Sequence, residues 1–185
     1  MILNSLTLGF IFSLLGFGIF LSFKILNFTD LTAEASFTFG AAISVMLVNL
    51  GLPELGLFLS LLGGALAGGI TAFLHQKLKI DKVLAGILTL TAFYTINLLV
   101  TGFSPNLSLE KAVRTIFPRG EEVASFFIAM GFALAVALFL IFFFRSNLGI
   151  AIRASGDNEQ VVKTAGKSVD LYQGLGLMLS NALIA

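Results

Sequence analysis

The sequence predicts an all-α fold, a polytopic bundle of transmembrane helices with five full spans and the start of a sixth. Three observations lead to this fold class. Of the 185 residues, 57% are hydrophobic and only 11% are charged. The mean hydropathy is +1.01, well above that of a soluble globular domain. The uncharged residues also form long runs, most of them long enough to cross about 30 Å of hydrocarbon as a helix.

The first three runs predict a retained first span followed by a helical hairpin. Residues 1–23 carry no charge, and a secretory signal would instead have a basic start and a shorter apolar core. The second and third runs, residues 35–52 and 55–74, are separated by a short turn that contains Pro53. Because proline lacks a backbone N–H and disfavours helix before it, the chain is expected to reverse there.

Two further runs, residues 83–103 and 123–144, complete the five full spans. Residues 171–185 begin a sixth run of 15 residues, which is too short to cross the membrane. We therefore interpret residues 1–185 as a single transmembrane domain, expected to be a fragment of a longer domain or a truncated copy of one. Residues 145–170 form a loop within it.

Basic residues between the runs predict the orientation. If the spans alternate, the loops 24–34, 75–82 and 145–170 share one side of the membrane. They hold eight of the eleven Lys and Arg residues, and the loop 104–122 holds three. The positive-inside bias places the eight in the cytoplasm and the N-terminus outside. A re-entrant segment at 25–31 would remove this argument for the first loop only.

Small residues lie four apart in the third run, at 63/67, 64/68 and 65/69. This spacing lets another helix approach closely on more than one side. We interpret it as helix packing within one subunit rather than as a dedicated dimer interface.

Polar residues in the fourth run share one helical face, because their offsets are three, three and four. They are Thr91, Tyr94, Asn97 and Thr101. Polar groups at membrane depth need partners, so this face is expected to point into the bundle interior. There it would either bond to a neighbouring helix or line a solute path.

The loop 145–170 is expected to contain a short capped helix. Asp157 can act as its N-cap, with Gln160 bonding back to the backbone of the cap. Lys163 falls in the last turn, and Gly166 can supply the left-handed residue that ends the helix. Such a helix either meets a partner or rests on lipid as an interfacial helix. Its apolar side comprises Val161, Val162 and Ala165.

Several other chemistries are disfavoured, and we expect no catalytic residue and no metal site. The chain has no cysteine, and its sole histidine, His75, has no second metal ligand at helical spacing. Asp30 and Glu34 are four apart, where like charges repel, which favours a solvated or channel-mouth position. A net charge of +1 without a basic stripe argues against a nucleic-acid partner.

Two motifs resemble a known family. One runs from Asn27-Phe28-Thr29-Asp30-Leu31-Thr32 to Gly40-Ala41-Ala42. The other runs from Gly149 to Asn158 and is followed by Ala165-Gly166. In order and spacing they resemble the permease subunit of ABC importers of the branched-chain amino acid and ribose class. The second motif is the more specific, and the resemblance extends over the length of the chain.

This resemblance implies a cytoplasmic coupling helix that docks on a separate ATPase subunit, so ATP would be bound by the partner and no cofactor by this chain. It implies that the chain is not itself an enzyme. It also implies an extracellular solute-binding protein and a second permease copy or paralogue, in the bacterial inner membrane. The coupling role falls on Arg153, Gly156, Asp157, Asn158 and Gly166. For the solute path we predict Asn27, Asp30, Tyr94 and Asn97.

Two other function classes fit less well. An ion-coupled secondary transporter or channel subunit often has charged residues within its spans and half-helices broken at matching places, whereas the full spans here are uncharged. An intramembrane enzyme would need a metalloprotease pair or a nucleophile with its base, and neither is present in the sequence. We therefore expect an importer permease for a small polar solute, an amino acid or a related compound.

Overall fold

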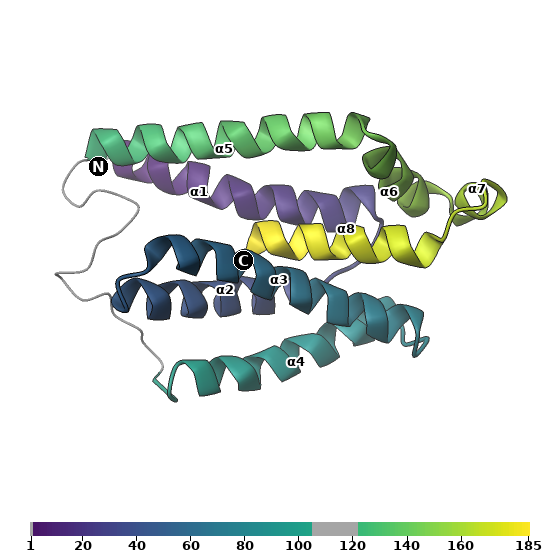
Figure 1. Cartoon of the computed structure of the whole chain (residues 1–185), viewed down its shortest axis with the longest axis horizontal. Helices are drawn as coiled ribbons and strands as arrows, with labels where there is room; N and C mark the ends of the chain where they lie inside the picture. The colour runs from purple at the N-terminus through teal and green to yellow at the C-terminus, as the bar shows by residue number, and fades with distance from the viewer. Residues whose placement is uncertain (1, 105–121) are drawn as a thin grey trace.

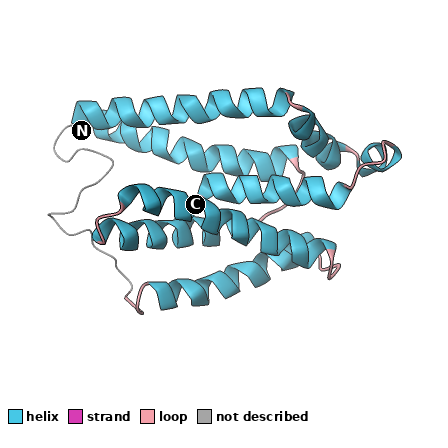
Figure 2. Ribbon diagram, viewed as in Figure 1, coloured by secondary structure: helices cyan, strands magenta, loops and turns pink. Residues whose placement is uncertain are grey.

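The structure, a computed structural model, describes residues 2–104 and 122–185, and within these ranges every regular element is a helix (Figure 2). Helix α1 continues into a π-helical turn, η1, and two short helices, α6 and α7, follow α5. The elements are α1 (Ile2–Phe20), η1 (Leu21–Ile25), α2 (Thr32–Asn49), α3 (Pro53–Gln76), α4 (Lys82–Val100), α5 (Glu122–Arg145), α6 (Asn147–Asp157), α7 (Glu159–Thr164) and α8 (Val169–Ile184).

Four helices in the described part of the chain are long and apolar enough to cross a membrane. They match the first, third, fourth and fifth predicted runs. The second predicted run forms α2, which has 18 residues, includes Glu34 and several Ser and Thr residues, and is not among the four. Helix α8, the predicted sixth run, has 16 residues. The all-helical membrane fold is therefore confirmed, but the count of five full spans is not. The four are Ile2–Ile25, Pro53–Gln76, Lys82–Val100 and Glu122–Arg145.

The long helices lie side by side, with α5 and α4 at opposite edges of the bundle (Figure 1). Helix α1 packs between α5 and α8, α8 packs on α3, and α2 contacts both α3 and α4. One end of the bundle, on the right of Figure 1, contains the segments 77–81 and 146–168 and the start of the segment 26–31. We call this the α7 end. These are the parts of the chain that the charge count assigned to the cytoplasm.

Glycines in α3 allow both neighbouring helices to approach closely. A Cβ at Gly64 or Gly68 would collide with backbone carbonyls of α8, and a Cβ at Gly63 would press on Phe39 of α2. Ala67 is fully buried against Ala35 and Phe93. The pairs 63/67 and 64/68 therefore admit α2 and α8, which confirms packing within one subunit at these positions.

Candidate functional site

Residues 26–31, here called the extended segment, join η1 to α2 without regular secondary structure and enter the bundle. Leu26, Phe28 and Asp30 are each 1% exposed, and the intervening side chains point outward. Asp30 bonds to Asn181, which lies 12 residues into α8, or about 18 Å along it. Non-helical backbone at this depth is tolerated only where protein or a water-filled cavity surrounds it. The segment is thus a built-in break in the helical bundle.

Six polar residues, linked through their side chains and the backbone N–H of Thr32, form a hydrogen-bonded chain through the interior, here called the buried polar network. They come from this segment and from four helices, and none is more than 1% exposed. Buried polar groups persist in a bundle when each finds a partner, so the network fixes how these elements meet. Its members are Asp30, Thr32, Ser36, Thr71, Thr89 and Asn181.

Asp30 occupies one half of the network. Its Oδ1 accepts from the backbone N–H of Thr32 at 2.9 Å, and its Oδ2 accepts from Asn181 Nδ2 at 2.6 Å. Asn181 Oδ1 in turn accepts from the hydroxyl of Ser36 at 2.6 Å. The carboxylate therefore ties the extended segment to α8, and α8 to α2.

Threonines form the other half of the buried polar network. The hydroxyls of Thr32 and Thr71 are 2.6 Å apart, and Thr71 donates to Thr89 Oγ1 at 2.9 Å. Sequence reasoning missed Thr71 and Thr89, because a lone Thr in an apolar helix is not distinctive. The usable signal was their neighbours: Thr89 shares a face with Ala85 and Gly86, and small residues mark the closely packed face of a membrane helix.

Glu34 lies one turn beyond Asp30 and borders two cavities. One cavity, of 370 Å³, lies between α1, α2 and α8 and is lined by Asp30, Glu34 and apolar side chains such as Phe37 and Ile184. The other, of 540 Å³, lies between α2 and α4 and is lined by Glu34, Tyr94, Leu90 and four Thr or Ala residues nearby. The structure thus brings Asp30 and Glu34 to the same cavity.

The expected inward orientation of the α4 polar stripe is wrong for Thr91 and Tyr94, whereas Asn97 and Thr101 are half-buried. Tyr94 is 65% exposed and Thr91 is exposed, whereas Thr89 and Phe93 are buried with the small residues of α4. Small side chains let α2 and α3 approach on one side, so the bulky polar side is left facing away from the bundle. Asn97 is half-buried, and its Oδ1 has no hydrogen-bond partner in the described part of the chain.

Asn27 lies apart from these cavities, at the surface of the extended segment. It adopts a left-handed φ of 49°, and its carbonyl accepts from Lys82 Nζ at 3.3 Å. The ring of the next residue, Phe28, packs against His75 with centroids 5.4 Å apart. His75 itself bonds to the carbonyl of Ile80 at 2.7 Å, near the end of α3. Of the predicted path residues, only Asp30 lines the cavity between α1, α2 and α8.

The predicted capped helix exists, but Asp157 is not its N-cap. Ser146 caps an earlier helix, α6, by accepting from Gly149 N, and α6 continues to Asp157. Asn158 is extended and caps α7, its Oδ1 accepting from Gln160 N at 3.0 Å. Gly166 adopts a φ of 70°, which confirms the left-handed ending.

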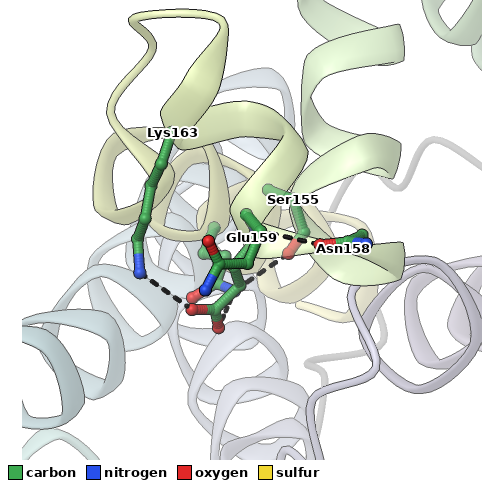
Figure 3. Close-up of polar contacts among 6 residues, drawn as sticks. Ser155, Asn158, Glu159 and Lys163 are labelled. Atoms are coloured by element: carbon green, nitrogen blue, oxygen red, sulfur yellow. Dashed lines mark hydrogen bonds and ion pairs between the residues drawn. The ribbon is translucent and has the colours of Figure 1, made fainter.

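Polar contacts hold the junction between α6, α7 and α8 (Figure 3). Lys163 Nζ lies 3.5 Å from Glu159 Oε2 within α7. Gln173 of α8, only 5% exposed, donates from Nε2 to the carbonyl of Ser155 at 3.1 Å and to Glu159 Oε1 at 3.3 Å. One side chain of α8 thus touches the end of α6 and the start of α7.

The predicted coupling residues divide into exposed and packed groups. Arg153 and Asp157 have 71% exposed side chains, with Arg153 Nε 4.0 Å from Asp157 Oδ2. Gly156 faces inward, where a Cβ would collide with the carbonyl of Ile25 and the backbone of Leu26. The end of α6 is therefore in direct backbone contact with η1 and the extended segment.

The comparisons with known proteins agree with this architecture. Residues 1–185 match the family described as "Branched-chain amino acid transport system / permease component". The chain is 34% identical over 185 residues to a tyrosine transport system permease protein of Clostridioides difficile (strain R20291), covering 100% of this chain and 61% of that protein. It is 30% identical over 170 residues to an uncharacterised protein of Rickettsia prowazekii (strain Madrid E), covering 91% of this chain and 59% of that protein.

This chain therefore spans 61% and 59% of the lengths of these two relatives. No solved structure matches it at a significant level. Because the family match covers every residue, the chain belongs to the permease component family of branched-chain amino acid transport systems.

Proposed function

We propose that this chain is the transmembrane permease subunit of an ATP-driven importer for an amino acid or a related small polar solute. The match to a permease family over residues 1–185 carries this proposal. Hydrolysis of ATP then falls to a separate ATPase subunit, and an extracellular solute-binding protein delivers the solute. The four apolar spans carry charged residues only near their ends, which favours this function over an ion-coupled carrier, and the buried carboxylate of Asp30 lies between spans rather than within one.

Helix α7 is the proposed contact with the ATPase subunit. It has six residues, too few to be stable alone, so its cap and its contacts with α8 must hold it in place. Val161 is 57% exposed on α7, and the exposed Arg153 and Asp157 lie on the adjoining α6. An apolar side chain flanked by charges suits a protein groove better than water.

Helix α8 is the proposed route from this contact to the interior. Gln173 meets α7 at one end of α8, and Asn181 holds Asp30 eight residues, or about 12 Å, further along. A displacement of α7 would therefore move α8 and with it the extended segment. The permease would contribute a two-state bundle whose equilibrium ATP binding on the partner shifts.

The outward face of α2 and α4 is the proposed solute path, completed by a second permease subunit. Polar side chains facing lipid are unfavourable, whereas the same groups are at home beside a water-filled path. The carboxylate of Glu34 on this face suits the ammonium group of an amino acid, whereas Asp30 lies in the other cavity, between α1, α2 and α8. The face comprises Glu34, Thr38, Thr91, Tyr94 and Thr95.

Co-purification tests this function directly. The protein is extracted from its native membrane in mild detergent, and ATP hydrolysis is measured on whatever accompanies it. We expect an ATPase subunit that is lost when the sequence of α7 is scrambled. Recovery of the protein alone, with transport that depends on an ion gradient, would instead favour a secondary carrier.

Asn158→Ala is expected to reduce solute-stimulated ATP hydrolysis in the assembled complex roughly fivefold, because losing an N-cap costs about 1 kcal/mol. The cap is a large share of what orders a six-residue helix. Asn158→Asp keeps a capping oxygen and serves as the matched control, with near-normal stimulation expected. Equal stimulation in the alanine variant and the wild type would contradict a coupling role for α7.

Replacing Arg153 and Asp157 together by Ala should uncouple the complex without unfolding it. Both side chains are 71% exposed, and an exposed i,i+4 pair contributes little to stability. We expect an unchanged unfolding temperature and a severalfold loss of solute-stimulated ATP hydrolysis. If hydrolysis is unaffected, these two residues lie outside the contact.

A further inference from the structure

A third cavity lies at the α7 end, on the opposite side of the bundle from the proposed solute path. It measures 630 Å³ and lies between α1 with η1, α5 and α6. Figure 1 shows α5 and α4 at opposite edges, so this cavity is remote from α4. Its walls are apolar side chains of α1 and α5, such as Phe17, Phe20 and Ile141.

Charged residues border the cavity only where η1 and α6 reach it. They are Lys24, Arg153 and Asp157. Arg153 is already paired with Asp157, since Arg153 Nε is 4.0 Å from Asp157 Oδ2, so the net charge of the three is that of Lys24. Lys24 makes no hydrogen bond or ion pair with any residue in the described ranges. An unpaired cation thus lies at one end of an apolar cavity.

The surroundings indicate that this end lies at the membrane surface. Leu148 and Ile150 of α6 are 52% and 55% exposed, next to the charged face of the same helix. A helix with apolar and charged exposed side chains is typical of the boundary between headgroups and acyl chains. On the adjacent helices, Phe20 and Ile141 are 55% and 52% exposed, which suits contact with hydrocarbon.

We propose that this cavity binds one anionic phospholipid, with the headgroup phosphate at Lys24 and an acyl chain along the apolar walls of α1 and α5. A single negative charge complements the net positive charge of the site, and basic pockets between helices on the cytoplasmic side suit such headgroups. A free phosphate ion would gain nothing from the apolar walls. The proposal requires only that the chain lies in a membrane, and it stands or falls independently of ATP-driven transport.

Native mass spectrometry of the protein purified from its native membrane tests this site. The detergent-solubilised protein is titrated with phosphatidylglycerol or with phosphatidylcholine of the same acyl chains. We expect the wild type to bind phosphatidylglycerol more tightly, and Lys24→Gln to weaken that binding about fivefold. Lys163→Gln, on α7 and outside the cavity, is the matched control and should bind like the wild type.

A second variant tests the apolar part. Ala137 lines the cavity from α5, so Ala137→Phe should fill it and weaken phosphatidylglycerol binding while leaving Lys24 in place. Lys24→Arg keeps the charge and should restore binding, which separates loss of charge from loss of fold. Equal binding of the two lipids by the wild type, equal binding by Lys24→Gln and Lys163→Gln, or unchanged binding by Ala137→Phe would each overturn the proposal.

Discussion

Asp30→Asn and Asn181→Asp should each lower the free energy of unfolding, by roughly 2 kcal/mol and 3 kcal/mol respectively, whereas the exchange variant D30N/N181D should recover most of the loss. The first change sets two amide nitrogens against each other at 2.6 Å, and the second sets two carboxylates there. Asn181 cannot simply rotate, because Ser36 donates to its oxygen and its nitrogen donates to the carbonyl of Leu177.

Between positions 30 and 181, the exchange variant restores a donor facing an acceptor with the polarity reversed, but the carboxylate at position 181 cannot donate to the carbonyl of Leu177, so a small part of the loss remains. The amide introduced at position 30 can still accept from the backbone N–H of Thr32, and Ser36 can donate to the carboxylate introduced at position 181. Unfolding in mixed micelles, followed by circular dichroism, measures all four proteins. A double variant as unstable as the worse single variant would show that these two side chains do not interact as described.

Two adjacent glycines of α3 should respond oppositely to the same substitution. Gly68→Ala should lower the free energy of unfolding by about 1–3 kcal/mol, because its Cβ would meet the carbonyl of Leu177 and, at 3.0 Å, the amide nitrogen of Asn181. Gly69→Ala should be neutral or stabilise the protein by up to about 1 kcal/mol, since alanine favours helix and the nearest atom, Met178 Cγ, is 3.5 Å away.

The same unfolding measurement distinguishes the two glycine variants, and each is the control for the other. If both stabilise the protein, α8 does not pack on α3 as closely as the structure indicates. If both destabilise it, the effect does not come from the close approach at Gly68.

The sequence was sufficient to locate the helices because a membrane span is a local property. Four of the predicted runs each overlap a described helix almost completely: 1–23, 55–74, 83–103 and 123–144. Uncharged length and flanking charge set these boundaries, and neither depends on distant residues. The left-handed Gly166 was predictable for the same reason, since it needs only its place after a helix.

The orientation of α4 was not predictable from its polar spacing. Periodicity groups residues by face, but whether a face points inward depends on what the neighbouring helices accept. Thr91 and Tyr94 share one face of α4, and Ala85 and Thr89 share another. Because α2 and α3 approach closely, the face with the smaller side chains packs against them. Steric fit prevailed over the usual rule that polar groups lie inside.

The cap of α7 was missed by one residue for a different reason. Asp157 and Asn158 are both good caps, so local preference does not separate them. Ser146 starts α6 eleven residues earlier, and that helix includes Asp157 before the chain extends at Asn158. The buried polar network was equally inaccessible, because Asp30 and Asn181 are 151 positions apart.

The π-helical turn η1 has a consequence for chain length. Leu26 N donates to Leu21 O, so this turn holds one residue more than an ordinary α-helical turn. A deletion of one residue within 21–25 would convert this π-helical turn into a regular α-helical turn, while α1 and the segment from Leu26 keep their positions. Homologues of different length are therefore expected to align with a single gap here, and the deletion would turn the side chains between the deleted position and Leu26 by about 100°.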